Sequence, residues 1–204
     1  MHQPIIFIFG PSGVGKSHLS NLIKKQNFLY VHIDTDDTKK TFVANGFPSE
    51  WDNDFSKVNF DVFVGKLRER LETEYDGVVV SFPTSYRFTK ENLDYLRKLG
   101  VIPILLWGTE ENCKLSAINR MKEKGKKTGR NLNMGRYLDR YDQKNLQTFQ
   151  LYSRPEYDTF KLEAFRVDGS RFLDEEIKKQ IDQMAYKLSH PTKEEIKIVE
   201  NSPK

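Results

Sequence analysis

The stretch IIFIFGPSGVGKS occupies residues 5–17 of the 204-residue chain. Five apolar residues, Ile5 to Phe9, come first and predict a short strand that is buried on both faces. The glycine-rich segment Gly10 to Ser17 follows and matches the pattern GxxxxGK[ST] in full. Apolar residues at helical spacing then predict a helix from about Lys16. A strand, a glycine-rich turn and a helix in this order predict a phosphate-binding loop.

The residue types in this loop suit the phosphates of a nucleotide. Glycines let the backbone curl so that successive N–H groups point inward, and the start of the helix adds its positive end. Lys16 has the length to reach the β- and γ-phosphates and is a candidate catalytic residue, while the Ser17 hydroxyl suits Mg²⁺. We therefore expect ATP as the ligand, with Mg²⁺ as its cofactor. The expected nucleotide-binding residues here are Gly10, Ser12, Gly13, Val14, Gly15, Lys16, Ser17 and His18.

Composition restricts the remaining classes. Lys plus Arg total 33 against 29 Asp plus Glu, and the net charge of +4 favours anionic ligands only weakly. No apolar run approaches the roughly eighteen residues of a membrane span, and the N-terminus lacks a basic signal-peptide region. The single Cys113 excludes an intrachain disulfide and suits a reducing compartment. We expect a cytoplasmic protein that does not enter membranes.

The fold class follows from the alternation of short apolar runs with segments of helical period. This pattern predicts an α/β protein with three layers, a central parallel β-sheet between helices. We expect one domain over residues 1–188, followed by a polar tail over residues 189–204. The predicted strands are Ile5 to Phe9, Leu29 to Ile33, Val78 to Phe82, Val101 to Trp107 and Ala164 to Val167.

An acidic turn follows the second predicted strand, with Asp34, Asp36 and Asp37 close together. Ligands of open α/β sheets bind beyond the carboxyl ends of the strands, so this turn can face the γ-phosphate. One carboxylate there would hold a water of Mg²⁺ and another would accept a proton from an attacking hydroxyl. We take Asp36 as the base and Asp34 as the metal residue, although the sequence also allows the reverse. The alternative is a helix cap at Asp36 or Asp37.

A basic segment lies further along the chain, with six Lys or Arg residues among the eleven positions from Arg120 to Arg130. Phosphoryl transfer develops negative charge, and cations on a closing lid stabilise it while excluding water. We expect a mobile lid over residues 120–136. The alternatives are a plain basic surface loop and a nucleic-acid patch.

The loop, the turn Ile33-Asp34-Thr35-Asp36 and the basic segment together resemble a group of P-loop kinases. This group contains shikimate kinase, gluconate kinase and polynucleotide 5′-hydroxyl kinases, which share the nucleoside-monophosphate-kinase-like fold. The resemblance implies that Arg120 packs against adenine and that Arg130 reaches the transferred phosphate as a catalytic residue. It also implies that backbone groups at Gly169, in the turn before the last helix, touch adenine.

On the acceptor side the resemblance is partial. Asp36-Asp37-Thr38-Lys39 resembles the Asp-Asp-x-Arg of hydroxyl kinases, and Arg154-Pro155-Glu156-Tyr157 resembles a substrate-holding segment of shikimate kinases. The glycine turn that shikimate kinases have after strand three is replaced here by Phe82 to Arg87, so shikimate itself is not expected. We expect a substrate-binding segment over residues 38–75. The candidate substrate-binding residues are Asp36, Lys39, Arg87 and Arg154.

The expected activity is transfer of the γ-phosphate of Mg-ATP to a hydroxyl of a small hydroxylated or anionic metabolite, by a monomer or dimer. The alternatives are a nucleoside or nucleoside-monophosphate kinase and a polynucleotide 5′-hydroxyl kinase. The basic segment favours the polynucleotide alternative, but a net charge of only +4 disfavours nucleic acid. A binding module that senses nucleotide without turnover also stays open, because the third predicted strand ends without an acidic residue.

Overall fold

The computed structural model describes residues 4–26, 30–34, 59–74, 76–84, 86–129 and 133–189. The chain divides into two compact units, residues 1–172 and residues 173–204. The domain expected over residues 1–188 crosses this division, and it stays a prediction together with its tail.

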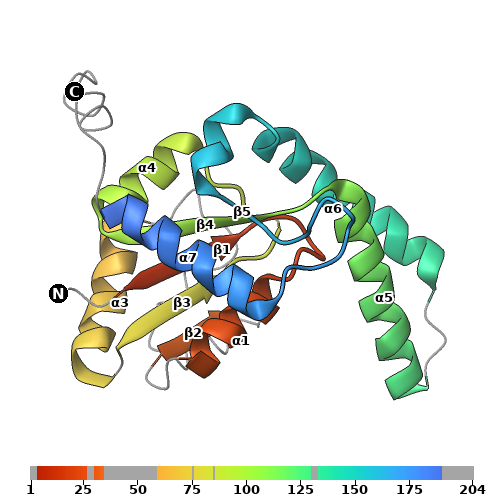
Figure 1. Cartoon of the computed structure of the whole chain (residues 1–204), viewed down its shortest axis with the longest axis horizontal. Coiled ribbons are helices and arrows are strands. Elements are labelled where there is room, and N and C mark those ends of the chain that lie inside the picture. The colour runs from red at the N-terminus through yellow and green to blue at the C-terminus, as the bar shows by residue number, and fades with distance from the viewer. Residues whose placement is uncertain are drawn as a thin grey trace. The chain divides into compact units, whose positions relative to one another are not determined.

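The first unit contains a five-stranded sheet in which every described pairing is parallel, with the order β2-β3-β1-β4-β5 (Figure 1). The first strand of the sequence is therefore the central one, between β3 and β4. In chain order, β1 is followed by β2 on one side of the sheet, and β3 is followed by β4 on the other side. The carboxyl ends of β1 and β3 therefore meet at a topological switch point, which is where α/β sheets bind ligands. The strands are β1 (Ile5–Phe9), β2 (Tyr30–Asp34), β3 (Gly77–Ser81), β4 (Val101–Trp107) and β5 (Lys161–Glu163).

The last strand corrects a prediction. Residues 164–167 were expected to form it, but β5 ends at Glu163. The Ala164 N–H still donates to the Trp107 carbonyl at 2.8 Å, and the chain then reverses. Gly169, at φ 81°, lies in the turn, and Phe165 forms an antiparallel bridge with Arg171. The apolar residues here are used in a local reversal, because the turn residues that follow prevent a longer strand.

Helices cover both faces of the sheet, as the sequence predicts. The buried side chains of β1 alternate: Phe7 and Phe9 belong to a cluster with α3 and α4, and Ile8 belongs to the opposite side. On that opposite side α1 packs along the strands and buries Leu19 and Ile23. The helices of the first unit are α1 (Lys16–Gln26), α3 (Phe60–Glu74), α4 (Lys90–Lys98), α5 (Glu110–Thr128) and α6 (Met134–Tyr152), with a short 3₁₀ helix η2 (Pro155–Phe160).

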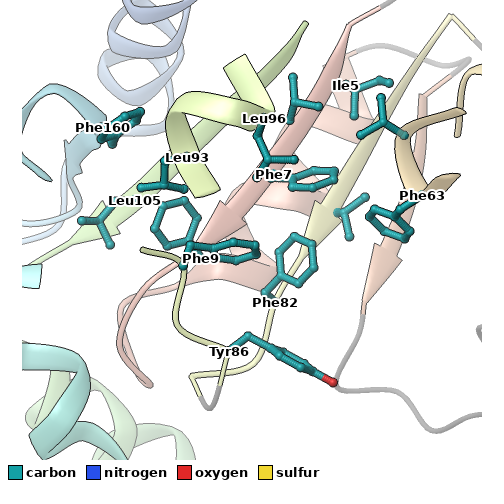
Figure 2. Packing of buried hydrophobic residues seen from close by; sticks show 14 of the residues in the cluster. Ile5, Phe7, Phe9, Phe63, Phe82, Tyr86, Leu93, Leu96, Leu105 and Phe160 are labelled. Atoms are coloured by element: carbon teal, nitrogen blue, oxygen red, sulfur yellow. The ribbon is translucent and has the colours of Figure 1, made fainter. Parts of the chain in front are cut away.

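The cluster on the α3 and α4 face is rich in aromatic rings (Figure 2). Phe82 is one of its central residues and makes edge contacts with Phe7 at 5.0 Å and with Phe88 at 5.1 Å between ring centroids. Each buried aromatic side chain removes a large apolar area from water, and edge-to-face pairs add a smaller geometric preference. This cluster fixes the end of β1 from which the glycine-rich loop leaves.

Local signals set several helix ends. Thr89 caps α4 in a reciprocal capping box with Asn92, and the acidic residues Glu110 and Glu111 occupy the first turn of α5. The second unit contains α7 (Asp174–Ser189). The described helices include none that is both long and apolar enough to cross a membrane.

Candidate functional site

The loop between β1 and α1 has a backbone that side chains would obstruct. Gly10 has φ 137°, and a Cβ atom there would lie 2.2 Å from the Leu106 carbonyl oxygen. Gly13 has φ 86°, and its Cβ atom would lie 2.1 Å from the Cys113 carbonyl oxygen. Both positions combine a left-handed backbone with close approach to other chain segments, so they require glycine. The loop therefore has the curled backbone that the sequence predicts, and it packs closely against β4 and α5.

Lys16 begins α1, and its ammonium group lies inside the loop. Its Nζ donates to the carbonyl oxygens of Gly10 and Pro11, each at 3.0 Å, and lies 3.5 Å from the Thr84 hydroxyl. Thr84 follows β3 and is itself held by the Thr148 hydroxyl of α6, which donates to its carbonyl at 3.1 Å. The cation therefore lies between the ends of the two neighbouring strands β1 and β3.

A second set of contacts ties α6 to the middle of the loop. The Ser12 N–H donates to Asn145 Oδ1 at 2.7 Å, and the Tyr141 hydroxyl donates to the Ser12 carbonyl at 3.0 Å. Asn145 Nδ2 in turn donates to the Tyr141 carbonyl at 2.8 Å. Asn145 is fully buried, and burial raises the pKa of Tyr141, which keeps its hydroxyl protonated as the donor. We call Tyr141 and Asn145 the α6 clamp.

Arg171 holds the loop from the other side. Its guanidinium donates to the Val14 carbonyl at 2.9 Å and to the Gly13 carbonyl at 3.0 Å. It also donates to the Ser116 hydroxyl of α5 at 2.7 Å and lies over the Phe165 ring, 4.7 Å from its centroid. These contacts join the turn after β5, the loop and α5.

The floor of the loop is the first part of α5. Cys113 is buried there, and its carbonyl group lies directly beneath Gly13. Burial raises the pKa of the Cys113 thiol to about 12, against the opposing effect of the Lys16 and Arg171 charges. The thiol is therefore neutral near pH 7 and acts as a packing group.

Two cavities lie along this structure. The first, of about 360 Å³, is called here the phosphate cavity. The second, of about 470 Å³, is called here the side cavity. Ser116, Arg120 and Arg171 line both, so the two adjoin. The remaining lining residues of the phosphate cavity are Ser12, Gly13, Gly15, Lys16, Ser17 and His18, and those of the side cavity are Asn112, Leu115, Asn119, Glu123, Phe165 and Gly169.

Most of the predicted nucleotide-binding residues thus come together from three parts of the chain. The loop residues from Ser12 to His18, except Val14, line the phosphate cavity, Arg120 of α5 lies where the two cavities meet, and Gly169 lines the side cavity. Gly10 and Val14 are not among the lining residues of either cavity. The Asp168 carboxylate accepts from the Ser170 N–H at 2.9 Å, and hydrogen bonds from Ser170 lower the pKa of Asp168. This exposed carboxylate shapes the turn around Gly169.

The residues predicted to bind the acceptor do not line these cavities in the described part of the structure. Arg87 is exposed and bonds to Gln147 of α6, and the exposed Arg154 pairs with Glu156 at 3.8 Å. Neither arginine is among the described residues that line the phosphate or side cavity. Asp34 ends β2 with its backbone paired to Ser81, but its carboxylate lies outside the described part of the structure. The predicted residues Asp36, Lys39 and Arg130 also lie outside the described residues.

Most of the basic segment is helical. Residues 120–128 continue α5 as a regular helix up to the left-handed cap at Gly129, and Lys126 and Lys127 lie in its last turn. Cations are favourable at a helix C-terminus, so helix formation offsets part of their mutual repulsion. Motion of residues 120–136 as a lid stays a prediction.

Metal ligation within the described residues rests on few groups. No three His, Cys, Asp or Glu side chains of this part of the chain gather in a way that could hold a metal ion. The Ser17 hydroxyl lines the phosphate cavity, where a cation held chiefly by phosphate oxygens would lie.

Sequence reasoning missed the residues that hold the loop in place. No helix was predicted between the basic segment and Arg154, yet α6 occupies residues 134–152. Its buried stripe contains Tyr141, Asn145, Thr148 and Tyr152, at i, i+4, i+7 and i+11. That spacing is a helical signal, but two of the four residues are Asn and Thr, which apolar periodicity does not detect.

The fold and the loop together define an α/β P-loop protein. No protein-family model and no curated protein sequence matches this chain. Among solved structures, it is similar to a gluconokinase from Sinorhizobium meliloti 1021, with 17% identity, a TM-score of 0.48 and coverage of 92% of this chain and 94% of that one.

Two shikimate kinases are also similar to this chain. The enzyme from Acinetobacter baumannii, solved in complex with shikimate, has 14% identity, a TM-score of 0.46 and coverage of 93% and 96% of the two chains. The enzyme from Bacteroides thetaiotaomicron has 15% identity, a TM-score of 0.49 and coverage of 90% and 98%. These proteins come from the P-loop kinase group that the sequence resembles, and the likeness concerns the fold.

Proposed function

We propose that this protein is a Mg-ATP-dependent kinase that phosphorylates a hydroxyl group of a small metabolite. The observation that carries the proposal is the loop at the end of β1, with Lys16 inside it and a second cavity beside it. A polyphosphate needs backbone N–H groups and cations, and a nucleotide base needs a partly apolar cavity. The phosphate cavity offers the first environment and the adjoining side cavity offers the second.

The nucleotide would lie across both cavities. Its phosphates occupy the phosphate cavity, with Lys16 at the β- and γ-phosphates and His18 in the first turn of α1. Its base occupies the side cavity, with the Arg120 guanidinium packed on the ring and the Gly169 backbone at its edge. Leu115 and Phe165 give that cavity its apolar surface.

Mg²⁺ would bind between the phosphates and the Ser17 hydroxyl, with Asp34 in its water shell. Mg²⁺ usually keeps several waters and takes one or two protein oxygens plus substrate phosphates, which suits this donor set. When bound, the ion neutralises charge that develops on the β- and γ-phosphate oxygens. Ser17 and Asp34 orient the ion, and Lys16 holds the same phosphate oxygens from the loop side.

The acceptor hydroxyl would meet the γ-phosphate beyond the carboxyl ends of β2 and β3. Asp36 takes its proton, because an alcohol is a poor nucleophile near pH 7. The new P–O bond forms as the bond between the γ-phosphorus and the β,γ-bridging oxygen breaks, and ADP leaves. Lys39, Arg87 and Arg154 bind the acceptor in this proposal. Arg130 stabilises the transferring phosphoryl group when residues 120–136 close as a lid.

Turnover tests the proposal directly. Purified protein with Mg-ATP should release ADP when a panel of hydroxylated metabolites is added, and product analysis should find the phosphate on one of them. Asp36→Asn should lower kcat by about 10²–10⁴-fold with little change in ATP affinity or melting temperature. Asp37→Asn is the matched control and should keep most activity, while Asp34→Asn should raise the Mg²⁺ concentration needed.

Two outcomes contradict parts of this proposal. Since Asn caps a helix as well as Asp does, an Asp36→Asn variant that keeps kcat, together with an Asp36→Ala variant that loses stability, would identify Asp36 as a helix cap. Nucleotide binding without turnover for any acceptor, nucleosides and oligonucleotides included, would support a sensor in place of a kinase.

A further inference from the structure

Among the described residues that line the two cavities, Arg171 is a cation that sequence patterns did not single out. It lies in the short return after β5, bridged to Phe165, and it reaches across to the loop 157 residues earlier in the sequence. It lines both the phosphate cavity and the side cavity.

Among the described residues, the partners of this guanidinium are neutral. They are two backbone carbonyls, the Ser116 hydroxyl and the face of Phe165. In the described part of the chain no carboxylate pairs with it, whereas Lys114 of the neighbouring α5 surface is paired with Asp142 at 2.8 Å. Arg171 is exposed as a residue, yet burial of its guanidinium lowers its pKa. An arginine stays protonated under these conditions, so its charge is left for an anionic ligand.

The contacts also act on the loop amides. The carbonyls of Gly13 and Val14 belong to the same peptide units as the N–H groups of Val14 and Gly15. A cation that binds the carbonyl end of a peptide unit polarises it and makes its N–H a stronger donor. Gly15 leaves the space for this arrangement, since a Cβ atom there would lie 2.5 Å from an Arg171 nitrogen.

We propose that Arg171 determines the affinity of the site for polyphosphate, by bracing the carbonyl side of the loop and by placing a positive charge between the phosphate cavity and the side cavity. The inference rests on the proposed nucleotide function and adds a residue to it. Arg171 is a positioning residue toward the loop amides and a binding residue toward the ligand's phosphates.

The test compares three probes on the full chain by calorimetry at low salt: a non-hydrolysable ATP analogue with Mg²⁺, inorganic tripolyphosphate, and adenosine. Arg171→Met keeps length and contact with Phe165 but removes the charge and the donors. It should weaken the ATP analogue and tripolyphosphate about tenfold or more and change adenosine less than twofold, because only the anionic probes feel the charge. Arg171→Lys should lose an intermediate amount, since one ammonium cannot bridge both carbonyls as a guanidinium does.

Arg166→Met is the matched control. Arg166 belongs to the same return and lies over the Phe172 ring at 5.6 Å, but it is not among the lining residues of either cavity. All three affinities should stay within twofold of the wild-type values.

Several outcomes overturn the inference. Unchanged affinity of Arg171→Met for both anionic probes would do so, and so would equal losses for tripolyphosphate and adenosine that follow a lower melting temperature. If Arg171→Met does not fold, Arg171→Lys decides, and tripolyphosphate affinity equal to wild type would refute the role. A wild-type protein that binds none of the probes would refute the proposed function as well, which separates that failure from this one.

Discussion

The phosphate loop is held on two sides by unlike chemistry. On one side the α6 clamp binds both backbone groups of Ser12 with neutral hydrogen bonds, and Asn145 is 0% exposed and Tyr141 4%. On the other side Arg171, an exposed residue, binds two carbonyls with a full charge. Both sets fix the same few residues of backbone, but they differ in what surrounds them.

The difference predicts separate roles. A buried neutral hydrogen bond stabilises the fold mainly because its loss leaves a polar group unsatisfied, and salt does not screen it. A charge near the surface contributes little to folding but attracts an anion, and salt weakens that attraction. We therefore expect the α6 clamp to govern stability and the cations to govern ligand binding.

Lys16→Ala should give the largest effect of all the variants, and this effect should fall on ligand binding and turnover, not on stability. We expect phosphoryl transfer to fall by about 10²-fold or more, because the cation at the γ-phosphate is lost. The melting temperature should change little, since Lys16 is only half-buried at the loop and a charge near the surface contributes little to folding. Lys24→Ala, in the exposed last turn of α1, is the control. Wild-type turnover in the Lys16 variant would refute the assignment of the loop.

Asn145→Leu should give the largest effect on stability. The Ser12 N–H would lose its acceptor at a partly buried position, which costs about 1–3 kcal/mol. Chemical denaturation at low and high salt should show the same loss at both. Gln143→Leu, on the exposed side of α6, serves as the control and should be near neutral. A loss that disappears at high salt would break the distinction between the two sides.

Tyr141→Phe should show a smaller loss of the same kind, about 0.5–1.5 kcal/mol, because only the hydrogen bond to the Ser12 carbonyl is removed. The ring keeps its packing. Denaturation midpoints of the single and double variants with Asn145→Leu would form a double-mutant cycle. Non-additive losses are expected, since both side chains hold the backbone of Ser12. Strict additivity would mean that they do not act as one clamp.

Cys113 gives the smallest effect on stability near pH 7, because its thiol is neutral there in both the folded and the unfolded state. It reports on the burial of the floor of the loop. Its raised pKa of about 12 means that the folded state retains a proton that the unfolded state loses above its ordinary value near 9. The free energy of unfolding therefore does not depend on this thiol below pH 9, and it falls progressively as the pH rises from 9 toward 12. At pH 8 a thiol reagent should label the folded protein far more slowly than the denatured one. Rapid labelling of the folded chain would contradict the buried floor.

Local sequence patterns predicted most of the fold and the loop part of the candidate site, but not the residues that hold the loop from elsewhere in the chain. The strand Ile5–Phe9, the loop and the start of α1 are contiguous in sequence, so a single motif specifies them. Arg171 and Asn145 are set by partners 157 and 133 residues away, and a bond between such distant positions leaves no local pattern. The last strand was misplaced because Phe165 and Val167 look like strand residues, while the reversal that takes over depends on Gly169.

The Lys16 contacts have a consequence for selectivity. The ammonium has its own oxygen partners at Gly10, Pro11 and Thr84 before any ligand arrives, so binding is an exchange of partners. An incoming anion must therefore interact more favourably with the ammonium than those neutral oxygens do together. Singly charged ions such as chloride offer little, whereas a chain of phosphates presents several charged oxygens at once to the ammonium and to the loop amides. The loop therefore sets a threshold, and common small anions should compete poorly for it.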